Sequence, residues 1–246
     1  SGFGLHDWIV FQTTRMEQDD VNERVAAILD GVQDSAATHA RYLKEFTKLC
    51  EVAGPDKVLR KCLMPALQHI LVVLKREPTV ERLVSFLIQF ASQSQFDIQG
   101  RPFPVHFMCE LLPFTNAAKG NRDTEVTKAV RFRSTQLVAG VLNALSEETE
   151  LKNDVWNSLE THLVQRASDK VPLIRIQAAL GLSRLQDVEE SANAASQAYL
   201  RLLSSDPNKE VRRTALKNLV TSRHTLQAIV DRVRDVSHEV RAETFR

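Results

Sequence analysis

The amino-acid sequence predicts an all-α fold, and two observations carry this prediction. Apolar residues recur at spacings of three, four and seven along most of the chain, and no segment shows sustained strict alternation of apolar and polar residues. Glycine and proline number only 8 each among 246 residues, too few for a fold rich in tight β-turns. Hydrophobic residues make up 43% and charged residues 26%, so the chain can bury a substantial core.

Each expected helix is an apolar stripe that ends in turn-forming residues. The stripes cover residues 21–32, 42–50, 80–90, 126–145 and 155–163. The turn-forming residues between and after them are Gly54-Pro55-Asp56, Glu77-Pro78, Gly120-Asn121, Asp169–Pro172 and Asp206-Pro207-Asn208. Because the connections are short, we expect consecutive helices to be antiparallel neighbours.

One motif returns three times in the second half of the chain: an Asp, followed five residues later by an apolar residue and an Arg. The copies are Asp169 with Ile174-Arg175, Asp206 with Val211-Arg212 and Asp235 with Val240-Arg241, and Asp123 with Val130-Arg131 resembles an earlier copy. The successive Arg residues are 44, 37 and 29 positions apart. Periods of this size are typical of stacked helix pairs of the HEAT or armadillo type, so we predict an α-solenoid over residues 21–246.

The Asp and the Arg of this motif both have a structural interpretation. The Asp falls in the turn between the two helices of a pair, where its carboxylate can cap the second helix. The Arg falls in the first turn of that helix, where the helix dipole disfavours a cation. It therefore needs a carboxylate, and the Asp of its own or of the adjacent repeat can bind it in a bidentate manner. We prefer this interpretation to a ligand-binding role for Arg175 and Arg241.

The two ends of the chain give further expectations. Residues 1–20 are expected to form a separate N-terminal segment, in which Ser1-Gly2 could be left from cloning. The chain stops at Arg246 inside a helical pattern, as a piece of a longer protein would. The three scattered cysteines indicate reduced thiols, and no apolar stretch is long enough to predict a transmembrane span or membrane partner.

Sequence motifs of enzymes and cofactor sites are missing. The chain contains neither the phosphate-binding glycine loops, nor the nucleophile elbow, nor the zinc-binding helix motif. His106 and Cys109 lie three residues apart, but no second pair completes a metal site. We therefore expect no enzymatic activity, no cofactor, no metal and no small-molecule substrate.

Positive charge is unevenly distributed, although the formal net charge is only +1. Residues 57–76 carry five Lys or Arg and no acid, and residues 200–246 carry ten against six acids, whereas residues 1–40 carry seven acids against two Arg. Charges that recur with a solenoid repeat align along one wall, and a basic stripe suits the phosphate backbone of duplex DNA. From charge alone, a scaffold for protein partners stays ahead of DNA binding. The arginines that could form the stripe are Arg131, Arg133, Arg212, Arg213, Arg232 and Arg234.

Five stretches of the sequence resemble the HEAT-repeat subunits of eukaryotic condensin, of the CAP-G type. They are LVVLKREPTVERLVSFLIQFAS (71–92), KAVRFRSTQLVAGVLNAL (128–145), DKVPLIRIQAALGLSRLQD (169–187), NKEVRRTALKNL (208–219) and AIVDRVRDVSHEVRAETF (228–245). The family's chain is several times longer, so the resemblance implies its N-terminal part. It also implies a non-enzymatic subunit that binds the condensin kleisin and, through it, the SMC ATPase subunits. With the kleisin, such a subunit holds double-stranded DNA in a basic groove for mitotic chromosome condensation. The resemblance implies that it acts in the nucleus and on chromosomes, and it allows an additional cytoplasmic pool.

The resemblance also indicates which basic residues contact DNA. The family's basic pair matches Lys75-Arg76, which we expect to close a helix just before Glu77-Pro78, where cations suit the helix dipole. Arg232 and Arg234 match a second basic position of the family. Taken with the charge pattern, the expected DNA-binding residues are Lys75, Arg76, Arg232, Arg234, Lys61, Arg60, Arg133, Arg212 and Arg213. The alternative is a HEAT-repeat scaffold whose concave face binds an acidic or extended peptide in another protein complex.

Overall fold

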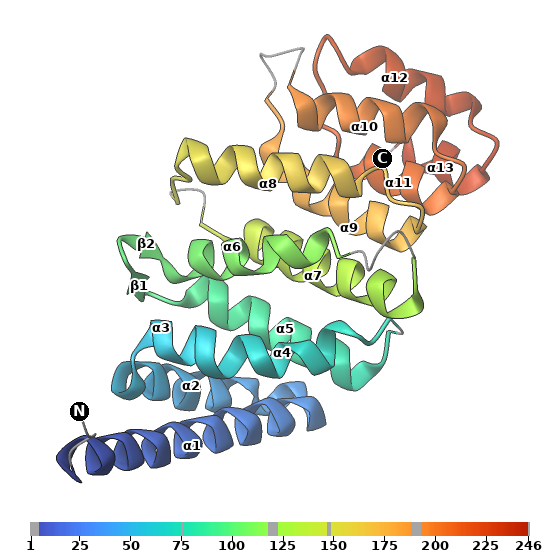
Figure 1. Ribbon diagram of the computed structural model, residues 1–246. Helices are drawn as coiled ribbons and strands as arrows, with labels where there is room; N and C mark the ends of the chain where they lie inside the picture. The colour runs from blue at the N-terminus through green and yellow to red at the C-terminus, as the bar shows by residue number, and fades with distance from the viewer. Residues whose placement is uncertain (1–4, 75, 118–122, 147–148, 188–192, 246) are drawn as a thin grey trace. The chain divides into compact units, whose positions relative to one another are not determined.

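A computed structural model describes residues 5–74, 76–117, 123–146, 149–187 and 193–245, with side chains from residue 19 onward. Helices dominate this part of the chain (Figure 1), which confirms the predicted all-α fold. The chain divides into two compact units, residues 1–70 with 75–103 and residues 71–74 with 104–246. The boundary expected at residue 20 falls inside the first helix.

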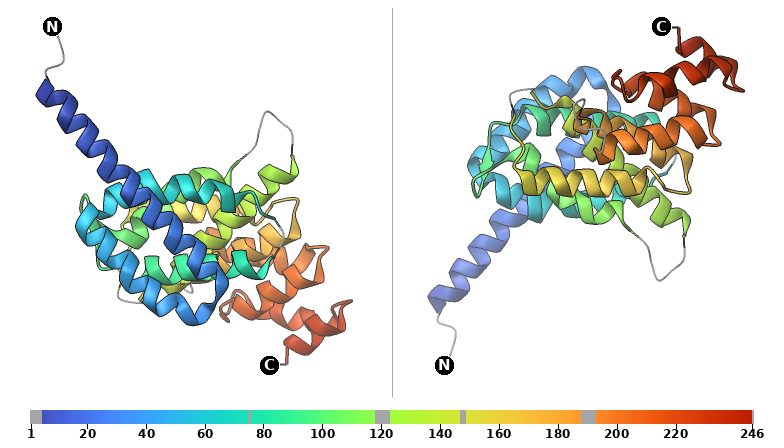
Figure 2. Two further views of the ribbon diagram at one scale, coloured as in Figure 1. Left: turned by 90° about the horizontal axis from the view of Figure 1, so that it is seen from below. Right: turned by 90° about the horizontal axis from the view of Figure 1, so that it is seen from above.

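The first unit consists of short helices packed beside one long helix. Figure 2 shows in both views that the N-terminal half of the long helix extends beyond its neighbours in this unit. Edge-to-face phenylalanine contacts hold the core, with 4.5 Å between the ring centroids of Phe46 and Phe90 and 5.3 Å between those of Phe90 and Phe103. The helices up to residue 93 are α1 (Leu5–Asp34), η1 (Ala36–Thr38), α2 (His39–Ala53), α3 (Pro55–Val58), η2 (Leu59–Leu63), α4 (Met64–Leu71) and α5 (Pro78–Gln93).

A small β-hairpin follows α5 and was not expected from the sequence. Strands β1 (Asp97–Ile98) and β2 (Arg101–Pro102) pair antiparallel across a two-residue turn. Both turn residues have positive φ, 54° at Gln99 and 76° at Gly100, as a type I′ hairpin turn requires. Strands of two residues are too short for an alternating pattern to reveal them.

The second unit stacks helices in two layers (Figure 1). Helices α8, α10 and α12 contact one another in order in one layer, and α7, α9, α11 and α13 do so in the other. This order confirms the predicted HEAT-type helix pairs. The bounds are α6 (Phe103–Thr115), α7 (Glu125–Ala144), α8 (Asn153–Arg166), α9 (Pro172–Leu182), η3 (Ser183–Leu185), α10 (Ala194–Ser205), α11 (Lys209–Asn218), α12 (Leu226–Asp231), η4 (Arg232–Arg234) and α13 (His238–Glu243).

Close packing between the layers depends on a glycine in α9. A Cβ atom placed on Gly181 would lie 2.9 Å from Cδ1 of Leu163 in α8 and 3.1 Å from Cβ of Ala139 in α7. Nearby, the buried Tyr199 hydroxyl donates a hydrogen bond to the Ala179 carbonyl, and burial raises the pKa of Tyr199. The core of this unit therefore leaves little spare volume around α9.

Candidate functional site

The repeated Asp and Arg residues form a ladder of buried ion pairs from one helix pair to the next, which we call the Arg–Asp ladder. Each side chain in these three pairs is at most 10% exposed. The Arg of one repeat therefore pairs with the Asp of the following repeat, which settles the choice that the sequence left open. The pairs are Arg131 with Asp169 (Nε to Oδ2, 2.8 Å), Arg175 with Asp206 (Nε to Oδ2, 2.6 Å) and Arg212 with Asp235 (Nη2 to Oδ1, 2.7 Å).

The same arginines also bind the turn of their own repeat. Nη1 of Arg175 donates to the carbonyl of Asp169 at 2.8 Å, and Nη1 of Arg212 donates to the carbonyl of Asp206 at 2.8 Å. Arg241 repeats this contact with the carbonyl of Asp235 at 2.6 Å. One guanidinium thus joins a turn to the next repeat, which explains why an Arg stands in a helix's first turn, where the dipole disfavours it.

The Asp residues do not cap the second helices in the way expected. Oδ1 of Asp206 accepts a hydrogen bond from the backbone N–H of Asn208 at 2.9 Å, and Asn208 is itself the N-cap of α11. The Asn208 side chain accepts the N–H groups of Glu210 and Val211. Each ladder Asp therefore orders the residue that begins the helix, two positions after itself.

The electrostatics of the ladder follow from these short contacts. The hydrogen bond from Arg212 lowers the pKa of Asp235, and the hydrogen bond from Arg131 lowers the pKa of Asp123. Oδ1 of Asp123 lies 2.9 Å from Nη1 of Arg131, so the earlier, shifted copy of the motif joins the ladder as well. The charged forms of both carboxylates are favoured in the folded protein.

Two further arginines support the ladder from the preceding helical segment, and the sequence interpretation missed this role. Nη1 of Arg166 lies 2.9 Å from Oδ2 of Asp169, and Nη1 of Arg232 lies 3.4 Å from Oδ2 of Asp235. Both arginines precede their Asp by three positions, so an Arg-x-x-Asp spacing was the signal available in the sequence. Burial lowers the pKa of Arg166.

Four of the nine residues expected to bind DNA have partners from distant parts of the sequence. Arg133 is fully buried and Arg212 is 6% exposed, so the expectation that they line a basic surface does not fit their positions. The Arg232 side chain is 18% exposed and also donates to the carbonyl of Leu203. Arg213 lies 3.0 Å from the carboxylate of Glu243.

The other expected residues differ in exposure and pairing. Lys61, Arg76 and Arg234 are exposed, and the described residues offer their side chains no ion pair. Arg60 is also exposed and lies 3.0 Å from Oδ1 of Asp56. Lys75 lies outside the described residues.

The basic pair at 75–76 was expected to close a helix, and this expectation is wrong for Arg76. Helix α4 ends at Leu71, and α5 begins at Pro78 with Glu77 as an extended N-cap. Arg76 therefore lies in the connection between two helices, where no C-terminal dipole acts on it. Its side chain is exposed there.

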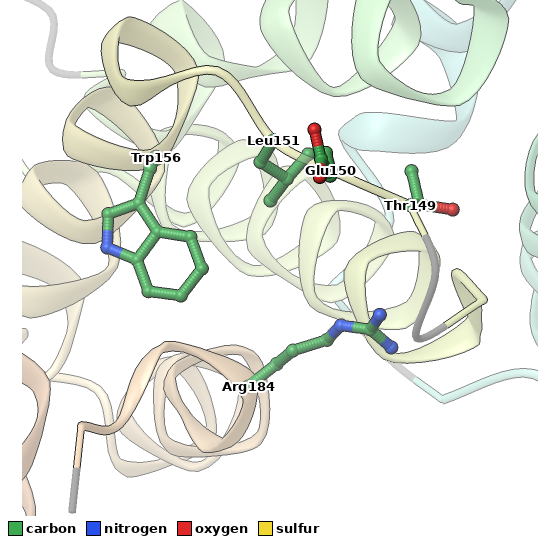
Figure 3. A pocket seen from close by; sticks show the side chains of 5 residues that line it. All are labelled: Thr149, Glu150, Leu151, Trp156 and Arg184. Atoms are coloured by element: carbon green, nitrogen blue, oxygen red, sulfur yellow. The ribbon is translucent and has the colours of Figure 1, made fainter.

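A pocket of about 520 Å³ in the second unit lies beside Trp156 of α8 and Arg184 of η3 (Figure 3). Figure 3 shows both side chains pointing into it, opposite Leu151. The Arg184 guanidinium donates to the carbonyls of Leu145 at 2.6 Å and Ser146 at 2.5 Å. This arginine therefore fastens the chain that leaves α7, and we assign the pocket no chemistry.

Within the described ranges, no cluster of His, Cys, Asp or Glu suited to a metal ion occurs. Likewise, none of the helices searched there has the length and apolarity to cross a membrane.

The stacked helix pairs and the Arg–Asp ladder define an α-solenoid of HEAT type. The chain is 34% identical to human condensin complex subunit 3 over 186 residues, covering 73% of this chain and 18% of that protein. It is 34% identical to the Xenopus laevis protein of the same name over 221 residues, covering 87% of this chain and 21% of that one. These matches place the chain in the family of condensin complex subunit 3, of which it spans about a fifth.

A solved structure agrees with this placement. The crystal structure of the Schizosaccharomyces pombe condensin Cnd3-Cnd2 subcomplex is similar to this chain with a TM-score of 0.73 and 29% sequence identity. The match covers 90% of this chain and 27% of the other. No family model matches the sequence.

Proposed function

We propose that this chain is part of a non-SMC regulatory subunit of condensin that binds double-stranded DNA through its phosphate backbone, without sequence preference. In this proposal the subunit has no enzymatic activity of its own. It acts in mitotic chromosome condensation in the nucleus and on chromosomes. The observation that carries the proposal is the similarity to condensin complex subunit 3 over most of the chain.

The proposed protein partner is the kleisin subunit of condensin, through which the SMC ATPase subunits would be reached. The solved relative is a complex of two condensin subunits, Cnd3 and Cnd2, which supports a partner of this kind. A solenoid suits this task because its stacked helices form an extended surface for a long, flexible segment.

The proposed DNA contacts are the exposed cations Arg76, Lys61 and Arg234, together with Lys75, which lies outside the described residues. An exposed guanidinium or ammonium without an internal carboxylate can replace the counterions of a phosphate, whereas a buried, paired arginine cannot. Arg60 is a weaker member of this set because Asp56 already neutralises part of its charge. In this proposal, DNA is not contacted by the four arginines that have distant internal partners, which are Arg133, Arg212, Arg213 and Arg232.

The test compares charge reversals by fluorescence anisotropy with a labelled DNA duplex, using the chain bound to its kleisin partner. Lys75→Glu with Arg76→Glu is expected to weaken binding on the order of tenfold for unrelated duplex sequences. Lys44→Glu with Lys48→Glu is the matched control, because it changes the net charge by the same amount and both lysines are exposed cations of the first unit that we do not place at the interface. Equal losses in both variants would assign the effect to net charge and would favour the protein scaffold.

A further inference from the structure

Arg133 differs from the ladder arginines in what it holds. Its side chain has 0% exposure in the middle of α7. Nη1 donates to the side-chain carbonyl of Gln136 at 2.7 Å, and the guanidinium carbon lies 5.1 Å from the centroid of the Phe132 ring. Burying a cation is costly unless each donor is matched, so the contacts made by Arg133 must repay its desolvation.

Another contact of Arg133 leaves α7 and reaches a distant part of the sequence. Nε donates to the backbone carbonyl of Val73 at 2.8 Å. Val73 lies between α4 and α5, and its own backbone is in neither a helix nor a strand. Leu71 to Leu74 belong to the same compact unit as Arg133, so this bond fastens the start of the connection to the unit's core.

Arg76 is exposed and follows Val73 by only three residues, although it belongs to the other compact unit. Three residues of extended chain span at most about 10 Å, so fixing the Val73 carbonyl limits where Arg76 can go. A charged side chain on an ordered segment loses less conformational entropy when it binds than one on a free segment.

We propose that Arg133 is a positioning residue for DNA binding: it orders the segment that carries Arg76 through its hydrogen bond to the Val73 carbonyl, and it does not contact DNA. This inference rests on the proposed DNA contact of Arg76. Arg133 would thus contribute to DNA recognition although its side chain is buried.

A double-mutant cycle on duplex affinity, in the kleisin-bound protein, tests the inference. Arg133→Met is expected to weaken binding about three- to tenfold, the scale of ordering one side chain and its segment. In the background of Arg76→Ala, the same substitution is expected to have no further effect. Additive losses would overturn the inference, because they would mean that Arg133 acts independently of Arg76.

Two further measurements separate positioning from loss of the fold. Leu137→Ala also damages the core around α7, since Leu137 is fully buried, but Leu137 is neither a hydrogen-bond partner of Arg133 nor the ring on which its guanidinium lies. Amide hydrogen exchange in peptides covering residues 72–79 should accelerate in Arg133→Met and stay unchanged in Leu137→Ala. Unchanged exchange in Arg133→Met would also overturn the inference.

If Arg133→Met does not fold, Arg133→Lys carries the same cycle, because it keeps the charge while moving the donor away from Val73. Failure of the proposed function gives a different result. In that case Arg76→Ala alone leaves duplex affinity unchanged, whatever hydrogen exchange shows at residues 72–79.

Discussion

Arg175 of α9 and Asp206, in the turn before α11, form a bidentate ion pair that joins two successive helix pairs. Nε lies 2.6 Å from Oδ2 and Nη2 lies 2.8 Å from Oδ1, and both side chains are at least nine-tenths buried. The same guanidinium binds the carbonyl of Asp169, so one side chain links the turns of adjacent repeats. The stacking of this solenoid unit thus depends on polar contacts as well as on apolar packing.

Breaking this pair should destabilise the protein strongly. Asp206→Ala leaves the Arg175 cation buried without its carboxylate, and we expect a loss of about 3–5 kcal/mol in the free energy of unfolding. Urea denaturation of Asp206→Ala, Arg175→Met and the variant with both substitutions should give a coupling energy of about 1–3 kcal/mol between the two side chains. The exposed Arg41–Glu45 pair is the control, with an expected coupling below about 0.5 kcal/mol. Equal coupling in the two pairs would contradict the ladder's role.

Asp235 should make stability depend on acid pH. Its hydrogen bond from Arg212 lowers its pKa in the folded state, so the unfolded chain takes up protons first as pH falls. The pair's contribution is therefore complete well above pH of about 4 and is lost as pH falls through the lower, folded-state pKa. Asp235→Asn should lower stability at neutral pH and flatten its decline in acid, as urea titrations at several pH values would reveal. Asp19→Asn, at an exposed position, should leave the decline parallel to that of the unchanged protein.

Gly181→Ala should destabilise the second unit despite the better helix propensity of alanine. The gain in propensity is about 1 kcal/mol, whereas overpacking a dense core costs about 1–3 kcal/mol. The new methyl group meets Leu163, which is fully buried and cannot easily move away. We expect a net loss of roughly 0–2 kcal/mol, measured by thermal or urea unfolding. A clear gain in stability would show that α7, α8 and α9 pack less tightly than described.

Substitution of Arg232 should affect mainly protein stability, whereas substitution of Arg234 should affect mainly duplex binding. Arg232 binds Asp235 and the Leu203 carbonyl, so Arg232→Met should lower the free energy of unfolding by about 1–3 kcal/mol. Arg234 is exposed, so Arg234→Glu should change stability by less than about 0.5 kcal/mol but weaken duplex binding. Parallel measurements of unfolding and of duplex affinity on both variants check this. A stability loss at Arg234 larger than at Arg232 would reverse the assignment.

The sequence predicted the helical fold and the repeat because both depend on spacing along the chain. Apolar residues at helical intervals identify buried faces, and the Asp-to-Arg spacing identifies the joint between repeats. The β-hairpin at 97–102 was not predicted, because its turn geometry, rather than any apolar pattern, defines it. The N-cap at Asn208 was not predicted, because the side chain of nearby Asp206 is equally suitable for capping a helix.

The candidate site was less predictable, because exposure of a cation cannot be read from its position in a motif. Arg212 and Arg213 are adjacent in sequence, yet one is buried against Asp235 and the other lies at Glu243, both from later segments. Arg133 looked like part of a basic stripe, but its partner Val73 lies 60 residues away. Counts of charged residues along the chain contain no information about such long-range contacts.

The salt dependence of duplex binding by the kleisin-bound protein is the sharpest test of phosphate contact through Arg76. If exposed cations replace counterions on phosphates, the logarithm of the binding constant falls linearly with the logarithm of salt concentration, steeply in the unchanged protein. Arg76→Glu should reduce that slope by about 1, and Arg41→Glu should leave it unaltered. A shallow slope in the unchanged protein, or an equal slope in Arg76→Glu, would contradict DNA binding through Arg76.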